Sequence, residues 1–302
     1  MKYWQILCCL IFILAGCAPY EDQSYFEPVK SSDYLLDSFQ GNTDFKLDGT
    51  FALTLGDINK IESIESFDGN STASLSAIYI GDITKINERT VILYCHDKYG
   101  NLDNYWQRIK LLGNLGLGQY GILAIDYRGY GLSSGHSTEG SITADVASGI
   151  KWLEDKGLTS DRLVLYGFGL GTVPVVNLAA KPRSLTPARI ILEAPIASME
   201  ALLQDAVYQS VPGHYLSGLD FNNADTIQSV TQPLLWFHGS DDDIYPPEHG
   251  QLVFNRHQGD NNSKLGFIVN GANHNNIPAK ISIGQDSFNQ YLLHIKTFFQ
   301  NY

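Results

Sequence analysis

The chain has 302 residues, of which 44% are hydrophobic and 17% charged, and this balance suits one globular domain with a sizeable core. Its formal net charge is −12, which gives no support for nucleic-acid binding, because phosphates are neutralised by a basic surface. Solubility alone explains an acidic balance of this kind. No metal-ligand cluster or cofactor motif is visible in the sequence, so we expect neither a metal nor a cofactor.

Residues 1 to 16 have the pattern of a bacterial lipoprotein signal peptide. Lys2 is the short basic region, and Ile6 to Leu14 is an apolar core too short for an ordinary membrane helix. The next residues, Leu14-Ala15-Gly16-Cys17, resemble a lipobox, whose cysteine becomes lipid-modified. The alternative is a plain secretory signal in which Cys17 is incidental.

The lipobox predicts cleavage before Cys17 and a mature protein that is anchored to a membrane through acyl chains on this cysteine. Several chains anchor a protein stably where a single chain does not. Cleavage removes one charged side chain, Lys2, so the mature net charge is −13. The residue after the cysteine is Ala18 and not an aspartate, which indicates the outer membrane if the host is Gram-negative. We therefore expect a lipid-anchored protein of the bacterial cell envelope.

The cysteines predict a fold without disulfides. Cys8 and Cys9 leave with the signal, Cys17 carries the lipid, and only Cys95 remains in the domain. Cys95 ends an apolar run, so we interpret it as a small buried hydrophobe and not as a reactive thiol.

Three segments are predicted: the signal peptide over 1–16, a tether over 17–44 and one domain over 45–302. The tether is polar, with a few aromatic residues. Two antiparallel strands are expected at 51–55 and 73–80. Strands and helices then alternate, with strands at 91–95, 121–126, 163–166, 189–193, 234–238 and 265–269, and helices at 103–115, 142–156, 173–180 and 281–299.

This alternation predicts an α/β fold with a mainly parallel central sheet and helices on both faces. In such sheets, functional sites form beyond the carboxyl ends of the strands. Unusual polar segments follow the predicted strand ends, namely Cys95-His96-Asp97-Lys98-Tyr99-Gly100-Asn101, Asp126-Tyr127-Arg128-Gly129-Tyr130-Gly131, His238-Gly239-Ser240-Asp241-Asp242-Asp243 and Gly271-Ala272-Asn273-His274-Asn275.

The stretch from Leu163 to Gly171 predicts a strand, a tight turn with three alternating glycines, and the start of a helix. A turn of this kind, written G-x-S-x-G, is the nucleophile elbow of α/β-hydrolases, which presents a strained and exposed serine. Gly169 stands where that serine would be. The sequence thus has the scaffold of a catalytic turn without its nucleophile.

A dinucleotide-binding loop, G-x-G-x-x-G, is an alternative interpretation of the same turn. Gly167 and Gly169 fit it, and Glu193 ends the next predicted strand, where a ribose-binding acid would lie. The third glycine position, however, is Thr172. That fold also places its loop after the first strand, whereas several units precede this one. A tight turn without any function is a third interpretation.

The chain resembles α/β-hydrolases of the serine-esterase and aminopeptidase-like group, and bacterial lipoproteins whose elbow reads Y-G-F-S-L-G are similar. The resemblance covers roughly residues 70 to 300 and rests on the chain order of nucleophile position, acid and histidine. The sequence D-Y-R-G-Y-G at 126–131 is specific for the group. Only a small cap fits between Glu193 and Pro233, so we expect a fairly open site.

The resemblance implies that His274 is the catalytic histidine and that Asp242 is the acid that orients it. It also implies an oxyanion loop around Asp97, with a second backbone N–H from Leu170. Around the acid, we interpret Asp241 and Asp243 as solvated or turn-forming residues, and His238 and Pro246 as structural residues.

Two positions depart from the family pattern. Gly169 has no hydroxyl, and Asp97 places a carboxylate where the family has glycine, close to a developing oxyanion. Our main hypothesis is a non-catalytic or degenerate serine hydrolase that binds a small molecule or peptide in its old pocket. The alternative is an active hydrolase of ester or peptide bonds that uses water activated by the histidine, or a relocated hydroxyl such as Thr172 or Ser198.

Overall fold

The structure is a computed structural model, and it describes residues 25–302 except 117–118, 208–217, 260–261 and 283–285. The predicted signal peptide and Cys17 lie outside the described residues. Among the helices of the described ranges, none has both the length and the apolar character needed to span a membrane.

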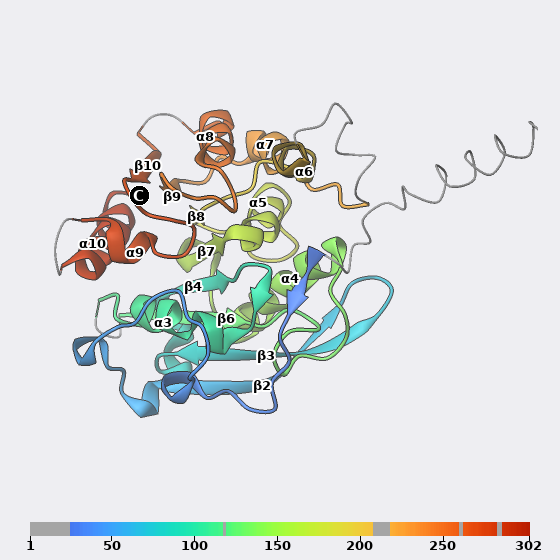
Figure 1. Cartoon of the computed structure of the whole chain (residues 1–302). Coiled ribbons are helices and arrows are strands. Elements are labelled where there is room, and N and C mark those ends of the chain that lie inside the picture. Colours follow the sequence, from blue (N-terminus) through green and yellow to red (C-terminus); the bar gives the residue numbers. More distant parts are fainter. Residues whose placement is uncertain (1–24, 117–118, 208–217, 260–261, 283–285) are drawn as a thin grey trace, which may run out of the picture.

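An eight-stranded sheet lies at the centre of the molecule, with the order β10-β9-β8-β7-β4-β6-β3-β2 (Figure 1). Two strands, β2 (Ile58–Phe67) and β3 (Thr72–Ile80), are antiparallel to their neighbours. The others are parallel: β4 (Thr90–Cys95), β6 (Tyr120–Ile125), β7 (Leu163–Phe168), β8 (Arg189–Glu193), β9 (Leu234–Gly239) and β10 (Lys264–Val269). The predicted mainly parallel sheet is confirmed.

Helices cover both faces of this sheet (Figure 1). One face packs against α3 (Leu102–Gly113), α9 (Ile277–Lys280) and α10 (Ser287–Asn301). The other packs against α4 (Glu139–Asp155), α5 (Thr172–Ala180), α6 (Met199–Val207), α7 (Asn223–Thr226) and α8 (Pro247–Arg256). Alternate strand residues enter opposite cores: Ile92 and Tyr94 face α3, and Leu93 and Cys95 face the other layer.

The start of the sheet differs from the prediction. Residues 49–57 form two short 3-10 turns, η2 (Gly49–Phe51) and η3 (Leu55–Asp57), and the edge strand is β2. The pairing of β2 with β3 shifts its register between Ile61 and Ile64. This irregularity breaks the two-residue periodicity that identifies a strand, which explains why the sequence did not reveal it. The predicted helix at 281–299 also begins later, as α10, after the separate α9.

The boundary predicted between tether and domain at residue 44 is wrong for the part that the structure describes. Strand β1 (Glu27–Pro28) pairs in parallel with β5 (Tyr99–Gly100). The Tyr34 hydroxyl donates to Asp126, and Asp44 accepts from Arg108 at 2.9 Å. Residues 25–44 therefore belong to the domain, because their aromatic side chains enter its two cores and their acidic side chains have partners on α3.

Candidate active site

Four loops at the carboxyl edge of the sheet bring the predicted site residues together. Asp97 follows β4, Gly169 and Leu170 follow β7, Asp242 follows β9, and His274 follows β10. Since these strands are parallel neighbours in the sheet, their ends meet at one edge.

His274 and Asp242 form the hydrogen-bonded pair that the resemblance implied. Nδ1 of His274 lies 2.8 Å from Oδ2 of Asp242, and both side chains are buried. The backbone N–H groups of Ile244 and Tyr245 donate to Oδ1 of Asp242 at 3.0 and 2.9 Å. Burial alone would raise the pKa of Asp242, but hydrogen bonds from His238 and His274 hold it below its usual range.

The second ring nitrogen of His274 contacts a second carboxylate. Nε2 lies 3.2 Å from Oδ2 of Asp97, and the ring stacks on Phe168 with centroids 4.8 Å apart. Burial disfavours the charged imidazolium, but the hydrogen bonds and charges of Asp242 and Asp97 outweigh it and raise the pKa of His274 to about 10. His274 is therefore protonated at neutral pH and cannot accept a further proton.

Asp97 also occupies the N–H group that the resemblance assigned to the oxyanion hole. The Leu170 N–H donates to Oδ1 of Asp97 at 2.6 Å, and the Tyr245 hydroxyl donates to the same oxygen at 3.2 Å. Burial would raise the pKa of Asp97, but the hydrogen bond and charge of His274, with the backbone N–H groups of Leu170 and Lys98, lower it. A substrate carbonyl would have to compete with this carboxylate for Leu170.

Gly169 and Asp97 fit together only because Gly169 lacks a side chain. A Cβ on Gly169 would lie less than 3.0 Å from the Asp97 carboxylate, closer than real Cβ atoms approach a neighbour. Gly169 also has a φ of +54°, in the left-handed region. A Cβ on Gly171 would clash with the backbone of Cys95 and His96, so the glycine turn also lets α5 approach β4 closely.

The loop that carries Asp97 is fixed by contacts of its neighbouring residues His96 and Lys98. His96 packs between the rings of Tyr105 and Tyr127, with centroids at 5.2 and 4.3 Å. Its Nδ1 lies 2.6 Å from the Asp97 carbonyl oxygen, and the Tyr130 hydroxyl donates to the Lys98 carbonyl at 2.6 Å. These contacts fix the backbone of Asp97, so its carboxylate is preorganised against His274.

The two hydroxyls considered as relocated nucleophiles have other partners. Thr172 Oγ1 donates to the Gly169 carbonyl at 2.7 Å, and Ser198 Oγ accepts from the Ala201 N–H at 3.1 Å. Both ring nitrogens of His274 face carboxylates. The histidine therefore activates neither hydroxyl in this arrangement.

Glu193, the candidate ribose ligand of the dinucleotide interpretation, is fully buried. Oε1 accepts from Arg108 at 2.6 Å, and Oε2 accepts from the hydroxyls of Tyr166 and Tyr291. The Arg108 guanidinium lies 4.2 Å from the ring centroid of Phe168, the ring on which His274 also stacks. The dinucleotide interpretation is therefore wrong, and Glu193 instead neutralises a buried arginine beneath the site.

The D-Y-R-G-Y-G segment supports the fold rather than the chemistry. Arg128 donates to Asp145 at 2.8 Å in the interior, and Asp126 accepts from the Leu102 N–H at 3.1 Å at the start of α3. Across the described residues, no cluster of three or more His, Cys, Asp or Glu is arranged to hold a metal ion.

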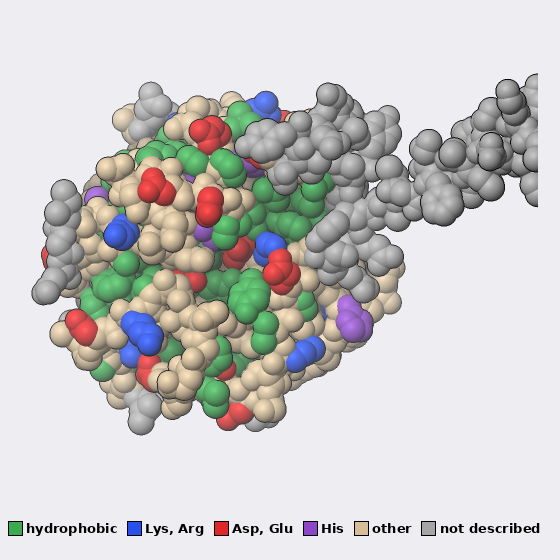
Figure 2. Space-filling model, in the orientation of Figure 1, with side chains coloured by type: hydrophobic (Ala, Val, Ile, Leu, Met, Phe, Trp, Pro, Cys, Tyr) green, Lys and Arg blue, Asp and Glu red, His purple; other side chains and the backbone are tan. Residues whose placement is uncertain are grey.

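A cavity of about 490 Å³ opens over Asp97 and His274. Its walls include Tyr99, Tyr105 and Ile244. On the face shown in Figure 2, acidic and basic side chains are dispersed among apolar ones and form no basic patch.

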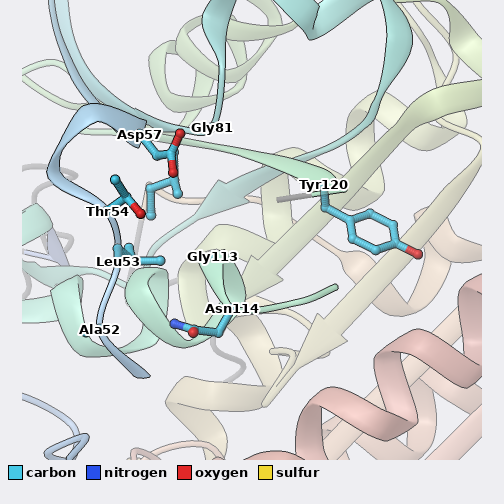
Figure 3. Close-up of a pocket in the computed structure, with 9 residues that line it drawn as sticks. Ala52, Leu53, Thr54, Asp57, Gly81, Gly113, Asn114 and Tyr120 are labelled. Atoms are coloured by element: carbon cyan, nitrogen blue, oxygen red, sulfur yellow. The ribbon is translucent and has the colours of Figure 1, made fainter. Parts of the chain in front are cut away.

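A second pocket of about 190 Å³ lies elsewhere, between Leu53, Gly81 and Tyr120 (Figure 3). Tyr120 begins β6, so this pocket lies at the amino end of that strand, away from the edge that carries the histidine. Asp57 is the one carboxylate among its lining residues. The cavity over His274 is therefore the better candidate for a functional site.

Comparisons with known proteins agree with this architecture. Residues 90–216 match the model of the alpha/beta hydrolase fold. Human alpha/beta hydrolase domain-containing protein 17B is 31% identical over 216 residues, which cover 70% of this chain and 67% of that protein. The chain belongs to the α/β-hydrolase family. The lysophosphatidylserine lipase ABHD12 of Xenopus tropicalis is 30% identical over 182 residues, covering 55% of this chain and 46% of that protein.

Solved structures share the fold of this α/β-hydrolase. An esterase of Pyrococcus furiosus matches with a TM-score of 0.62 at 17% identity, over 86% of this chain and 97% of the esterase. A bacterial membrane phospholipase A matches with a TM-score of 0.60 at 14% identity, over 82% of this chain and 88% of the phospholipase. These likenesses concern the fold, and the chemistry depends on the site.

Tyr245, Phe168 and Arg108 are site residues that sequence reasoning missed. Tyr245 contacts Asp97 through its hydroxyl and Asp242 through its N–H, and the Phe168 ring contacts both His274 and the Arg108 guanidinium. Phe168 directly precedes Gly169 in the elbow motif, so the motif could have predicted that Phe168 lies at the site. Arg108 lies on the buried face of α3, and no sequence pattern connects it to the histidine.

Proposed function

We propose that this α/β-hydrolase is a lipid-anchored, degenerate serine hydrolase that keeps the acid and the histidine but does not catalyse acyl transfer. One observation carries the proposal: the Asp97 carboxylate accepts from the Leu170 N–H at 2.6 Å and lies 3.2 Å from Nε2 of His274. Acyl transfer needs a nucleophile, a basic histidine and a free oxyanion hole. Gly169 offers no nucleophile, and Asp97 occupies both the histidine and the N–H group of the oxyanion hole.

The same contact argues against water activated by the histidine. General-base catalysis requires a neutral imidazole, and its pKa works best near the operating pH. The two carboxylates raise the pKa of His274 to about 10 against the opposing effect of burial, so the imidazolium predominates at neutral pH. A small molecule or peptide would bind in the cavity of about 490 Å³ above this ion triad.

A fluorophosphonate probe tests the loss of acyl transfer, because it labels an activated hydroxyl. We expect no labelling of the native protein and only background hydrolysis of simple esters. Thr172→Ala and Ser198→Ala serve as comparisons. Strong labelling of the native chain that disappears in either variant would replace this proposal with a relocated nucleophile.

The lipid anchor is supported by the motif Leu14 to Cys17. The variant Cys17→Ser should be released from the membrane fraction and should not incorporate a palmitate analogue. The matched control, Cys95→Ser, changes a buried cysteine within the domain and should still take up the analogue. A Cys17→Ser protein that remains lipid-labelled would overturn the anchor.

A further inference from the structure

We propose that the outer edge of β10 is a self-pairing surface, at which two copies of this chain join their central sheets across a two-fold axis at Gly266. The partner is a second copy of the chain, and the two β10 strands run antiparallel. The pairing goes beyond the proposed function, because it involves neither the Asp97 site nor the lipid anchor.

The outward backbone groups of β10 identify this edge as one that can pair with another strand. Within the described residues, β10 ends the sheet and pairs with β9 alone (Figure 1). The Leu234 N–H donates to the Ser263 carbonyl, and the Ser240 N–H donates to the Val269 carbonyl, both at 3.0 Å. The odd-numbered residues from 263 to 269 therefore point their backbone groups towards β9. The residues whose N–H and C=O groups point away from the sheet are Lys264, Gly266 and Ile268.

The opposite edge of the same sheet has features that prevent such pairing. β2 shifts its register between Ile61 and Ile64, and it carries the charged residues Lys60 and Glu65. The Lys60 ammonium donates to the Tyr34 carbonyl at 2.9 Å, so the N-terminal segment also lies beside β2. Irregular register, charges and covering segments are the means by which proteins protect an exposed sheet edge. The β2 edge is therefore closed to a further strand.

β10, which the structure describes in full, lacks this protection. Its six residues, Lys264–Val269, pair with β9 in unbroken register and contain no proline. Its one charged side chain, Lys264, extends onto α8, where Nζ lies 3.4 Å from the Phe254 carbonyl oxygen and 5.2 Å from the Phe254 ring centroid. The side chain of Ile268 is 48% exposed. A regular apolar strand with an open edge favours pairing with another strand.

The sequence of β10 suits pairing with its own copy. An antiparallel register about Gly266 places Gly266 opposite itself and Lys264 opposite Ile268 of the second copy, so that each of these pairs exchanges two backbone hydrogen bonds. The two Lys264 residues are then four positions apart, roughly 13 Å along the strands, so like charges do not meet. Ile268 of one copy instead packs on the aliphatic part of Lys264 of the other. The interface is therefore self-complementary in hydrogen bonds and free of charge repulsion between the strands.

The surroundings of β10 are also compatible with a closed dimer. A Cβ on Gly266 would lie 3.1 Å from the Phe254 ring of α8, and on the other face the Phe267 ring lies 4.3 Å from the His294 ring of α10. Burial lowers the pKa of His294, so this ring adds no charge beside the edge at neutral pH. The His274 loop follows β10, so antiparallel pairing directs the two cavities to opposite ends of the joined sheet. Because the β2 edges are protected, the pairing stops at two copies.

Disulfide cross-linking of the whole chain tests the register. The double variant Lys264→Cys, Ile268→Cys places thiols opposite each other with Cα atoms about 5.5 Å apart, within disulfide range. Within one chain the two positions are roughly 13 Å apart and cannot bridge. Mild oxidation should therefore give a reducible dimer on electrophoresis, whereas each single variant and the native chain should not cross-link. A double variant that forms no dimer, or single variants that cross-link equally, would overturn the proposal.

The protein mass, measured by light scattering on the whole chain in mild detergent, tests the dimer without cysteines. The native chain should have twice the mass of one chain. Ile268→Lys should halve this mass, because it sets a second lysine opposite Lys264 of the other copy. Phe67→Lys is the matched control, since Phe67 is 63% exposed on β2 and its replacement should leave the doubled mass unchanged. A native chain with the mass of one copy, or a dimer that survives in Ile268→Lys, would overturn the pairing.

Discussion

The carboxylate of Asp97 lies where a side chain on Gly169 would have to emerge. A Cβ on Gly169 would come within 3.0 Å of that carboxylate, so a serine at 169 and an aspartate at 97 cannot both be present without a shift. Glycine at 169 and aspartate at 97 are therefore a coupled pair of substitutions. Together they replace a hydroxyl nucleophile by a buried ion triad of Asp97, His274 and Asp242.

The first prediction concerns the pKa of His274. Imidazole carbon chemical shifts should show it protonated at neutral pH, with a pKa near the value of about 10 that the two carboxylates favour against burial. Asp97→Asn removes one neighbouring charge and should lower this pKa by about one to three units. Asp241→Asn should leave it unchanged. A pKa of His274 near 6.5 in the native protein would show that the triad is not charged.

The second prediction is the pH dependence of stability. The pKa of His274 is raised in the folded state from 6.5, so its contribution is complete below about pH 6.5 and is lost as the pH rises towards about 10. Against the effect of burial, the hydrogen bond of His274 lowers the pKa of Asp97, and the hydrogen bonds of His238 and His274 lower the pKa of Asp242. The contribution of these carboxylates is therefore lost as the pH falls below about 4.

Thermal unfolding between pH 6 and 10 tests the histidine part. The melting temperature of the native protein should fall over this range, and that of His274→Gln should fall less. Equal slopes for the two proteins would mean that the imidazolium contributes nothing to the fold.

The third prediction concerns the N-terminal segment. A chain that starts at Tyr25 should unfold cooperatively at the temperature of the mature protein, in reductant and chelator. A chain that starts at Phe45 loses Tyr34, which donates to Asp126, and Asp44, which pairs with Arg108. We expect its melting temperature to be clearly lower. Identical melting curves would show that residues 25–44 do not contribute to the domain.

The fourth prediction concerns the buried cation Arg108, which packs on the Phe168 ring. Arg108→Met leaves Glu193 buried without its charge partner, and losing one partner of such a pair costs about 3–5 kcal/mol. Lys151→Met is the matched control, because Lys151 is exposed and pairs with Glu154 and Asp155 on the next turn of its own helix. Urea unfolding should separate the two variants. An Arg108→Met protein as stable as Lys151→Met would contradict the importance of this network.

Much of the sheet was predictable because its buried strands are short apolar runs that end in glycine or polar motifs. The strands at 91–95 and 163–166 were found within two residues of β4 and β7. The edge strand β2 was missed because its register shift hides the alternation. Residues 25–44 were read as a tether because their partners, such as Asp126 and Arg108, are distant in sequence.

The positions of the site residues followed from the resemblance, but their interaction did not. The sequence placed Asp242 and His274 in the family order, and the structure joins them at 2.8 Å. Asp97 was expected only to disturb an oxyanion. Its contacts with His274 and Leu170 depend on the absence of a side chain at Gly169, a relation between three loops that no local pattern encodes.

The most direct test of the loss of acyl transfer is to reverse both substitutions and measure fluorophosphonate labelling and ester hydrolysis. Gly169→Ser alone should stay inactive, because its side chain would meet Asp97. Asp97→Gly alone should stay inactive, because no nucleophile is present. The double variant should be labelled and should exceed the native rate by at least about a hundred-fold, within the roughly million-fold that a nucleophile contributes elsewhere. A native protein, or a Gly169→Ser variant, that reacts as fast as the double variant would contradict the account.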